Sequence, residues 1–144
     1  MLARVGGGAD DAGAWYAALT SREEFLKLPE FMPDASTTVA ALKEAVRRFA
    51  DERAWEPFHS PKNLSMALAA EVGELLEHFL WVDSEPSRRV VDDPGKRQSV
   101  ADELADVAIL LLNLSMSTGI DLSDAIESKM VRNAIKYPPP ARTP

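Results

Sequence analysis

Two pairs of acidic residues have a spacing that could bind a metal ion. Glu71 and Glu74 form the first pair, and Glu103 and Asp106 form the second. On an α-helix, residues three positions apart point within about 60° of each other, so each pair offers two carboxylates on one helical face. Two such helices packed together would gather four carboxylates, and like charges about 4 Å apart repel by about 4 kcal/mol at an effective dielectric constant near 20. A cation must balance such a cluster, and all-oxygen ligation favours Mg²⁺, with Mn²⁺ as a substitute.

The surrounding sequence favours a metal site over an ordinary solvated face. An exposed helix usually mixes charge signs, with Glu followed one turn later by Lys. Residues 63–87 hold five acidic residues and no Lys or Arg, and residues 98–128 hold six acidic residues and again no Lys or Arg. Glu71 and Glu103 also border the apolar stripes of their helices, where a bare carboxylate is costly to bury. The alternative is a non-catalytic helical interaction module with acidic faces for a basic partner, but it does not explain why two helices repeat one arrangement.

Aromatic and basic residues near the acidic helices could bind a nucleotide. Trp55, His59 and Trp81 flank the first acidic helix. Aromatic side chains can stack on any nucleobase, although most Trp residues serve in packing. The last predicted helix carries three cations, Lys129, Arg132 and Lys136. They could bind a phosphate chain, or they could simply be an exposed helix end that the helix dipole stabilises. A nucleotide pocket and plain packing both remain interpretations at this level.

Composition excludes several classes of protein. The chain has 144 residues, which suits one domain with a real core. Its net charge of −7 gives no basic field to attract nucleic acid, and it has no cysteine for disulfide or thiolate chemistry. The N-terminal residues lack the apolar core of a signal peptide, and the strongest apolar run, residues 107–114, is too short to cross a membrane. We therefore expect a soluble, cytoplasmic protein that binds neither nucleic acid nor membrane.

The hydrophobic periodicity predicts helices throughout. Helices are expected over about 38–54, 61–81, 96–118 and 121–137, with a polar loop over 83–97. Ser60 followed by Pro61 is typical of a helix start, and Gly119 of a helix end. The apolar stripes expected to face the core are Leu64, Leu68, Val72, Leu75 and Phe79, then Val100, Leu104, Val107, Leu111 and Leu114, then Leu122, Ile126 and Met130.

These elements predict an all-α fold, a bundle of four to five helices. Residues 1–37 are expected to form a flexible N-terminal extension with one short helix, which the capping box Ser21-x-x-Glu24 would start. Residues 38–138 would form the helical domain, and residues 139–144 a tail.

The acidic signature resembles that of a known family. Glu-x-x-Glu at residues 71–74, followed about thirty residues later by Glu-x-x-Asp at residues 103–106, is similar to the signature of the MazG-like, all-α nucleoside triphosphate pyrophosphohydrolases. The resemblance is closer to the dCTP pyrophosphatase subgroup and covers about residues 38–138. It is carried by the runs 49–64, 71–75, 79–81, 102–107 and 128–130, together with Asn133, Lys136, Tyr137 and Pro138.

The resemblance implies roles for individual residues. Mg²⁺ would be held by Glu71, Glu74, Glu103 and Asp106. In the mechanism that we expect, one glutamate orients or deprotonates the attacking water, and we assign this role to Glu74. The base and sugar would be lined by Trp55, His59 and Trp81, and the triphosphate or sugar by Lys129, Asn133 and Tyr137. The family also implies a homo-oligomer with pockets completed between chains, a tetramer being favoured and a dimer possible. Two positions depart from the subgroup pattern, where Val46 replaces a histidine and Leu110 a tyrosine, and these bear on base preference.

The function that the resemblance implies is Mg²⁺-dependent hydrolysis of a nucleoside triphosphate, dCTP or a related pyrimidine deoxynucleotide, to the monophosphate and pyrophosphate. Such an enzyme would sanitise the nucleotide pool. Rival interpretations within the superfamily are a dUTP-preferring enzyme and a phosphoribosyl-ATP pyrophosphohydrolase. The non-catalytic helical module is the rival outside it.

Overall fold

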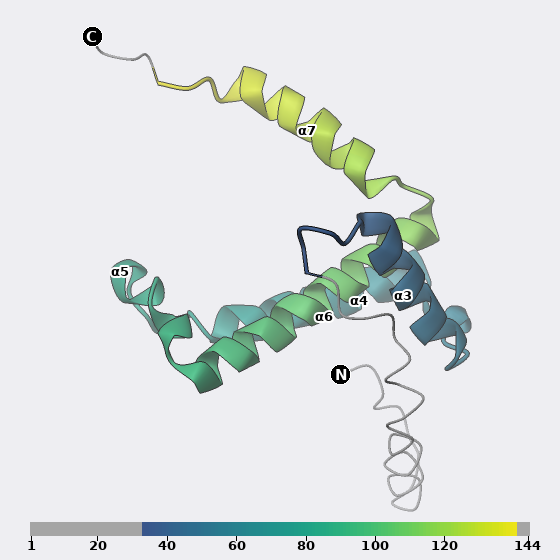
Figure 1. Cartoon of the computed structure of the whole chain (residues 1–144), viewed down its shortest axis with the longest axis horizontal. Coiled ribbons are helices and arrows are strands. Elements are labelled where there is room, and N and C mark those ends of the chain that lie inside the picture. The colour runs from purple at the N-terminus through teal and green to yellow at the C-terminus, as the bar shows by residue number, and fades with distance from the viewer. Residues whose placement is uncertain (1–32, 141–144) are drawn as a thin grey trace, which may run out of the picture. The chain divides into compact units, whose positions relative to one another are not determined.

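A computed structural model of the chain describes residues 33–140, and these residues are all-α (Figure 1). The helices are α3 (Val39–Asp51), α4 (Pro61–Glu77), α5 (Ser84–Ser87), α6 (Pro94–Thr118) and α7 (Leu122–Lys136), with 3₁₀ turns at Glu56–Phe58 and Val90–Asp92. No strand occurs within the described range. The predicted fold class of four to five helices is confirmed.

The chain divides into two compact units, residues 1–41 and 42–144. Within the first unit, the described residues form a turn over 34–36 and the beginning of α3. The short helix predicted near residues 21–29 lies outside the described residues. The predicted limits of the extension (1–37), the helical domain (38–138) and the tail (139–144) stay predictions.

Side-chain caps set the beginnings of the helices. The backbone N–H of Asn63 donates to Ser60 Oγ at 3.2 Å, as the sequence predicted for α4. Asp93 Oδ1 accepts from the Lys96 N–H at 2.8 Å, and Asp121 Oδ1 from the Asp124 N–H at 3.1 Å. Such caps satisfy donors that the helix leaves free. Because Asp93 caps α6 and Pro94 suits the first helical position, α6 begins at Pro94 rather than at Lys96.

Gly119 ends α6 as predicted. Its φ of 66° is left-handed, a conformation that strains residues with a Cβ. The Gly119 N–H donates to the Met116 carbonyl at 3.1 Å, and the Ile120 N–H donates to the Ser115 carbonyl at 3.0 Å. This pair of bonds is a Schellman motif, which closes the helix.

The other boundaries differ modestly from prediction. Helix α3 ends at Asp51 rather than at 54, and α4 ends at Glu77 rather than at 81, where turns replace the last helical residues. The segment expected to be a polar loop, 83–97, contains α5, the Val90–Asp92 turn and the first residues of α6. The Asp83 backbone is extended at the N-cap of α5. Pro86 is tolerated in this short helix because a backbone N–H in the first helical turn has no acceptor within the helix.

Helices α4 and α6 pack against each other and run antiparallel (Figure 1). The residue before α4 is hydrogen-bonded to the last turn of α6, where Ser117 Oγ donates to the His59 carbonyl at 3.1 Å. The start of α4 therefore lies beside the end of α6. This arrangement brings the middle of α4, with its acidic pair, beside the first half of α6.

The described chain buries little apolar surface. The buried apolar residues are Ala50, Leu64, Val100, Leu110 and Leu112. Leu64 and Val100 are buried as predicted, but the expected core residues Val72 and Leu104 are 48% and 52% exposed. In α7, the predicted inward residues Ile126 and Met130 are 49% and 64% exposed, and no residue of that helix is buried. Within residues 33–140, the stripes of α4 and α6 are therefore only partly covered, and that of α7 contains no buried residue.

No single helix of residues 33–140 is both long and apolar enough to cross a bilayer. Helices α6 and α7 meet the length and composition only when taken together, and they are bent by 99° at the break between them.

Candidate active site

Three carboxylates meet where α4 and α6 pack. Glu71 and Glu74 from α4 and Glu103 from α6 each place one oxygen within 4.8 Å of the others. Their burial is graded, since Glu71 is 4% exposed, Glu103 is half-buried and Glu74 is exposed. The cluster therefore has a buried member, Glu71, and a member that solvent reaches, Glu74. The predicted convergence of two acidic helices is present for these three residues.

Glu103 has a side-chain oxygen without a hydrogen-bond donor among the described residues and a raised pKa. Its Oε2 atom is buried and has no hydrogen-bond partner among the described residues. Burial raises the pKa of Glu103, and the negative charges of Glu74, Glu71 and Asp106 raise it further. A buried acceptor without a donor is costly, and a divalent cation would satisfy it and reverse the repulsion.

Asp106 lies near this cluster without joining the group of three. It is half-buried, and its charge contributes to the raised pKa of Glu103. The role of all four acids as metal ligands stays a prediction. His78 is half-buried, and its charge opposes the rise in the pKa of Glu103.

A compact loop before α4 carries two of the predicted base-binding residues. The Trp55 ring meets the His59 ring edge to face, with centroids 6.2 Å apart, and meets the Phe49 ring in the same manner at 5.7 Å. Both Trp55 and His59 are half-buried. The Arg53 guanidinium lies 3.5 Å from the Phe49 ring centroid, which is a cation–π contact. The structure therefore brings Trp55 and His59 together.

The backbone of this loop is held at several points. Ala54 has a left-handed φ of 53°, which turns the chain at the end of α3, and the Trp55 N–H donates to the Ala50 carbonyl at 3.1 Å. Asn63 Nδ2 donates to the Phe58 carbonyl at 3.1 Å, and Ser117 Oγ donates to the carbonyl of His59. Asn63 and Ser117 are not among the residues predicted for the site. Asn63 could have been noticed only as a polar residue in the first turn of a helix that begins with Ser-Pro. No local sequence pattern indicates Ser117.

The remaining predicted residues lie in the turn after α4, on α7 and just after α7. Trp81 is 90% exposed in the turn after α4. Lys129 and Tyr137 are exposed on α7 and at its end, whereas Asn133 is half-buried. The Lys136 ammonium lies 5.0 Å from the Tyr137 ring centroid. No hydrogen bond or ion pair of the described residues links Lys129, Asn133 or Tyr137 to Glu74 or Glu103.

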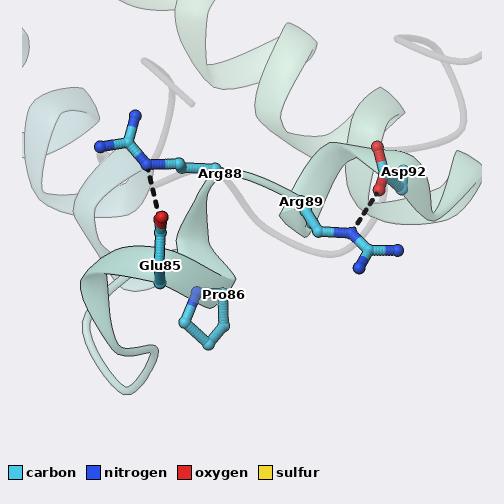
Figure 2. A pocket seen from close by; sticks show the side chains of 5 residues that line it. All are labelled: Glu85, Pro86, Arg88, Arg89 and Asp92. Atoms are coloured by element: carbon cyan, nitrogen blue, oxygen red, sulfur yellow. Dashed lines mark hydrogen bonds and ion pairs between the residues drawn. The ribbon is translucent and has the colours of Figure 1, made fainter.

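Figure 2 shows a surface hollow over α5 and the following turn, and none of the predicted site residues lines it. It is lined by Glu85, Pro86, Arg88, Arg89 and Asp92. Arg88 Nε bonds Glu85 at 2.8 Å and Arg89 Nε bonds Asp92 at 3.2 Å, so each guanidinium already faces a carboxylate. Neither the acidic cluster nor the aromatic loop lines this hollow. We therefore do not assign it as the active site.

The chain is similar to known proteins of one family. The model of the MazG-like family matches residues 66–142. The chain is 37% identical to dCTP pyrophosphatase 1 of Mus musculus and 38% identical to that of Homo sapiens, over 128 residues in each case, covering 88% of this chain and 75% of each relative. A crystal structure of a pyrophosphatase from Archaeoglobus fulgidus superposes with a TM-score of 0.66 and 35% identity, covering 75% of this chain and 99% of that one. The chain belongs to the MazG-like family and, within it, to the dCTP pyrophosphatase subgroup.

Proposed function

We propose that this chain hydrolyses dCTP, or a related pyrimidine deoxynucleoside triphosphate, to the monophosphate and pyrophosphate in a Mg²⁺-dependent reaction. The class of enzyme follows from the family, and the chain is a nucleoside triphosphate pyrophosphohydrolase. The observation that carries the proposed site is the cluster of Glu71, Glu74 and Glu103. The proposed role is sanitation of the nucleotide pool in the cytoplasm.

The donor set of the acidic cluster fits a hard divalent cation. Three carboxylates converge from two helices, and one buried oxygen of Glu103 has no hydrogen-bond donor in the described chain. Mg²⁺ takes oxygen ligands and is commonly held by carboxylates together with substrate phosphates. Glu71, Glu74, Glu103 and Asp106 would hold Mg²⁺, or Mn²⁺ in its place. When bound, the ion would neutralise negative charge on the phosphate oxygens.

Glu74 is the residue that we assign to the attacking water. It is the exposed member of the cluster, so a water molecule can reach it from solvent. Its carboxylate would accept a proton as the water oxygen bonds to the α-phosphorus. The bond from the α-phosphorus to the bridging oxygen then breaks, and that oxygen leaves with the electron pair on pyrophosphate. The products are the nucleoside monophosphate and pyrophosphate.

Aromatic residues would hold the base and sugar. Trp55 and His59 already form an edge-to-face pair that is half-buried, which fixes the ring planes before substrate arrives. Trp81 offers a ring that is 90% exposed and free to stack. Lys129, Asn133 and Tyr137 would bind the triphosphate or the sugar, and Lys129 supplies charge opposite to that of the phosphates.

Assembly into a homo-oligomer accounts for two features of the single chain. The first is the apolar surface of α7, where the exposed residues are Ile126, Met130, Val131 and Ile135. The second is the distance between the aromatic loop and the acids. Ser60 and Glu71 are eleven residues apart on α4, which is about 17 Å at about 1.5 Å per residue. A pocket built between chains would bring the loop of one chain to the acids of another. We favour a tetramer, with a dimer as the smaller alternative.

A nucleotide panel tests reaction class and substrate together. Purified protein with Mg²⁺ is given dCTP, dUTP, CTP, dATP and phosphoribosyl-ATP, and pyrophosphate and orthophosphate are measured separately. The expected result is pyrophosphate release that is fastest with dCTP. Preference for dUTP or phosphoribosyl-ATP would support the corresponding rival, and Val46 and Leu110 are then the positions to exchange. Orthophosphate as the first product would refute attack at the α-phosphorus.

The non-catalytic rival makes a separate prediction. An acidic interaction module has no reason to gain stability from Mg²⁺ together with a non-hydrolysable dCTP analogue. The enzyme should show a rise in melting temperature that requires both, because ligands that bind only the folded state stabilise it. Absence of this rise, together with absence of pyrophosphate release, would refute the proposed function.

A further inference from the structure

One side-chain hydrogen bond joins parts of the described chain that are far apart in sequence. Ser117 Oγ, in the last turn of α6, donates to the His59 carbonyl at 3.1 Å across 58 positions. The neighbouring hydroxyls bond within their own helix: Ser115 Oγ donates to the Leu112 carbonyl at 2.9 Å and Thr118 Oγ1 to the Leu114 carbonyl at 2.8 Å. Ser117 has one hydroxyl donor, and it is used outside α6.

The acceptor is a backbone group that the helix cannot satisfy. The first carbonyl to accept within α4 is that of Ser60, which receives the Leu64 N–H at 2.9 Å. The His59 carbonyl lies one residue earlier, and no backbone N–H of the described chain reaches it. The hydroxyl of Ser117 therefore supplies the donor that this carbonyl would otherwise take from water.

The same bond fixes the aromatic loop to the helix that carries Glu103. The other bonds of the loop, from Trp55 to Ala50 and from Asn63 to Phe58, are local in sequence and hold the loop only to its own flanking helices. His59 in turn packs edge to face on Trp55. A shift of the His59 backbone would therefore move both rings relative to α6.

We propose that Ser117 is a positioning residue for nucleotide binding, which acts by holding the His59 backbone and, through it, the Trp55–His59 ring pair. This inference rests on the proposed function, in which those two rings bind the base. It assigns Ser117 to substrate affinity and not to the chemical step.

Steady-state kinetics of the full-length protein test the assignment. Ser117→Ala should raise KM for dCTP about fivefold, which corresponds to about 1 kcal/mol, while kcat stays within twofold of wild type. Ser117→Thr keeps the hydroxyl and should restore KM. Thr118→Ala is the matched control, because its hydroxyl bonds only its own helix, and its KM should equal that of wild type. The indole N–H cross-peak of Trp55 in a ¹H–¹⁵N spectrum should shift in Ser117→Ala and not in Thr118→Ala.

Each outcome decides the matter. A raised KM that Ser117→Thr reverses, with a Trp55 shift, supports the assignment. An unchanged KM in Ser117→Ala overturns it, as does an equal change in Thr118→Ala, or a fall in kcat accompanied by a lower melting temperature. If the wild type releases no pyrophosphate, the proposed function fails and this inference fails with it. An active wild type with an unaffected Ser117→Ala refutes the positioning role alone.

Discussion

Replacing Glu71 by glutamine should weaken Mg²⁺ binding and, in the absence of the ion, leave the protein at least as stable as wild type. Glu71 is 4% exposed, and its carboxylate lies within 4.8 Å of that of Glu74. At that distance two unit charges repel by about 1 kcal/mol in water and by about 3.5 kcal/mol at an effective dielectric constant of 20. Because Glu74 is exposed, the lower figure applies. Relief of about 1 kcal/mol corresponds to a rise of about 4 °C in melting temperature for a chain of this length.

The assay is thermal unfolding in EDTA and in 10 mM Mg²⁺, with Glu77→Gln as the matched control on the same helix outside the cluster. In EDTA, Glu71→Gln should melt at or above the wild-type temperature. In Mg²⁺ the order should reverse, because an ion at 100 times its Kd stabilises the folded wild type by about 2.7 kcal/mol. Glu77→Gln should follow wild type in both buffers. If Glu71→Gln gains as much from Mg²⁺ as wild type does, the cluster is not the cation site.

Four further predictions follow from the same structure. Lowering the pH from 7 towards 5 should stabilise the metal-free protein more than its Glu103→Gln variant. The Glu103 carboxyl has a raised pKa in the folded state and the ordinary pKa of 4.5 in the unfolded chain, so the folded state binds its proton at a higher pH. The free energy of unfolding therefore falls as the pH rises through this window. Leu64→Ala should cost about 3 kcal/mol, measured by urea unfolding, because Leu64 is 2% exposed and a cavity would remain. Met130→Asp should leave the chain folded by circular dichroism but reduce its mass by light scattering, since this side chain is 64% exposed in one chain. Ala54→Gly should raise the melting temperature slightly, because a left-handed Ala at φ 53° costs about 1 kcal/mol.

Much of the fold could be predicted because local chemistry decides it. Ser60, Pro61, Asp121 and Gly119 act on their nearest neighbours, so their positions in the sequence are enough to place three helix ends. The start of α6 was placed two residues late, because Asp93 and Pro94 were assigned to a loop. The core was harder, since an apolar stripe predicts that a face will be covered but not by what. Val72 and Leu104 belong to such stripes and remain about half exposed in a single chain.

The acidic part of the site could be predicted, and the loop anchors could not. Glu71, Glu74 and Glu103 come together because Glu71 and Glu103 border the apolar stripes of α4 and α6, and these two helices pack against each other. Ser117 meets the His59 carbonyl only because α4 and α6 run antiparallel in one register. The sequence does not reveal this register, so it could not predict the contact.

Helix α7 contributes no buried residue to its own chain. If another chain covers α7, as in the proposed oligomer, the contribution of this helix to the free energy of unfolding would depend on protein concentration through mass action. In the proposed oligomer the helix also carries Lys129 and Asn133, which ties substrate affinity to the same equilibrium. Specific activity should then decline on serial dilution before any chain unfolds, and addition of substrate should delay that decline.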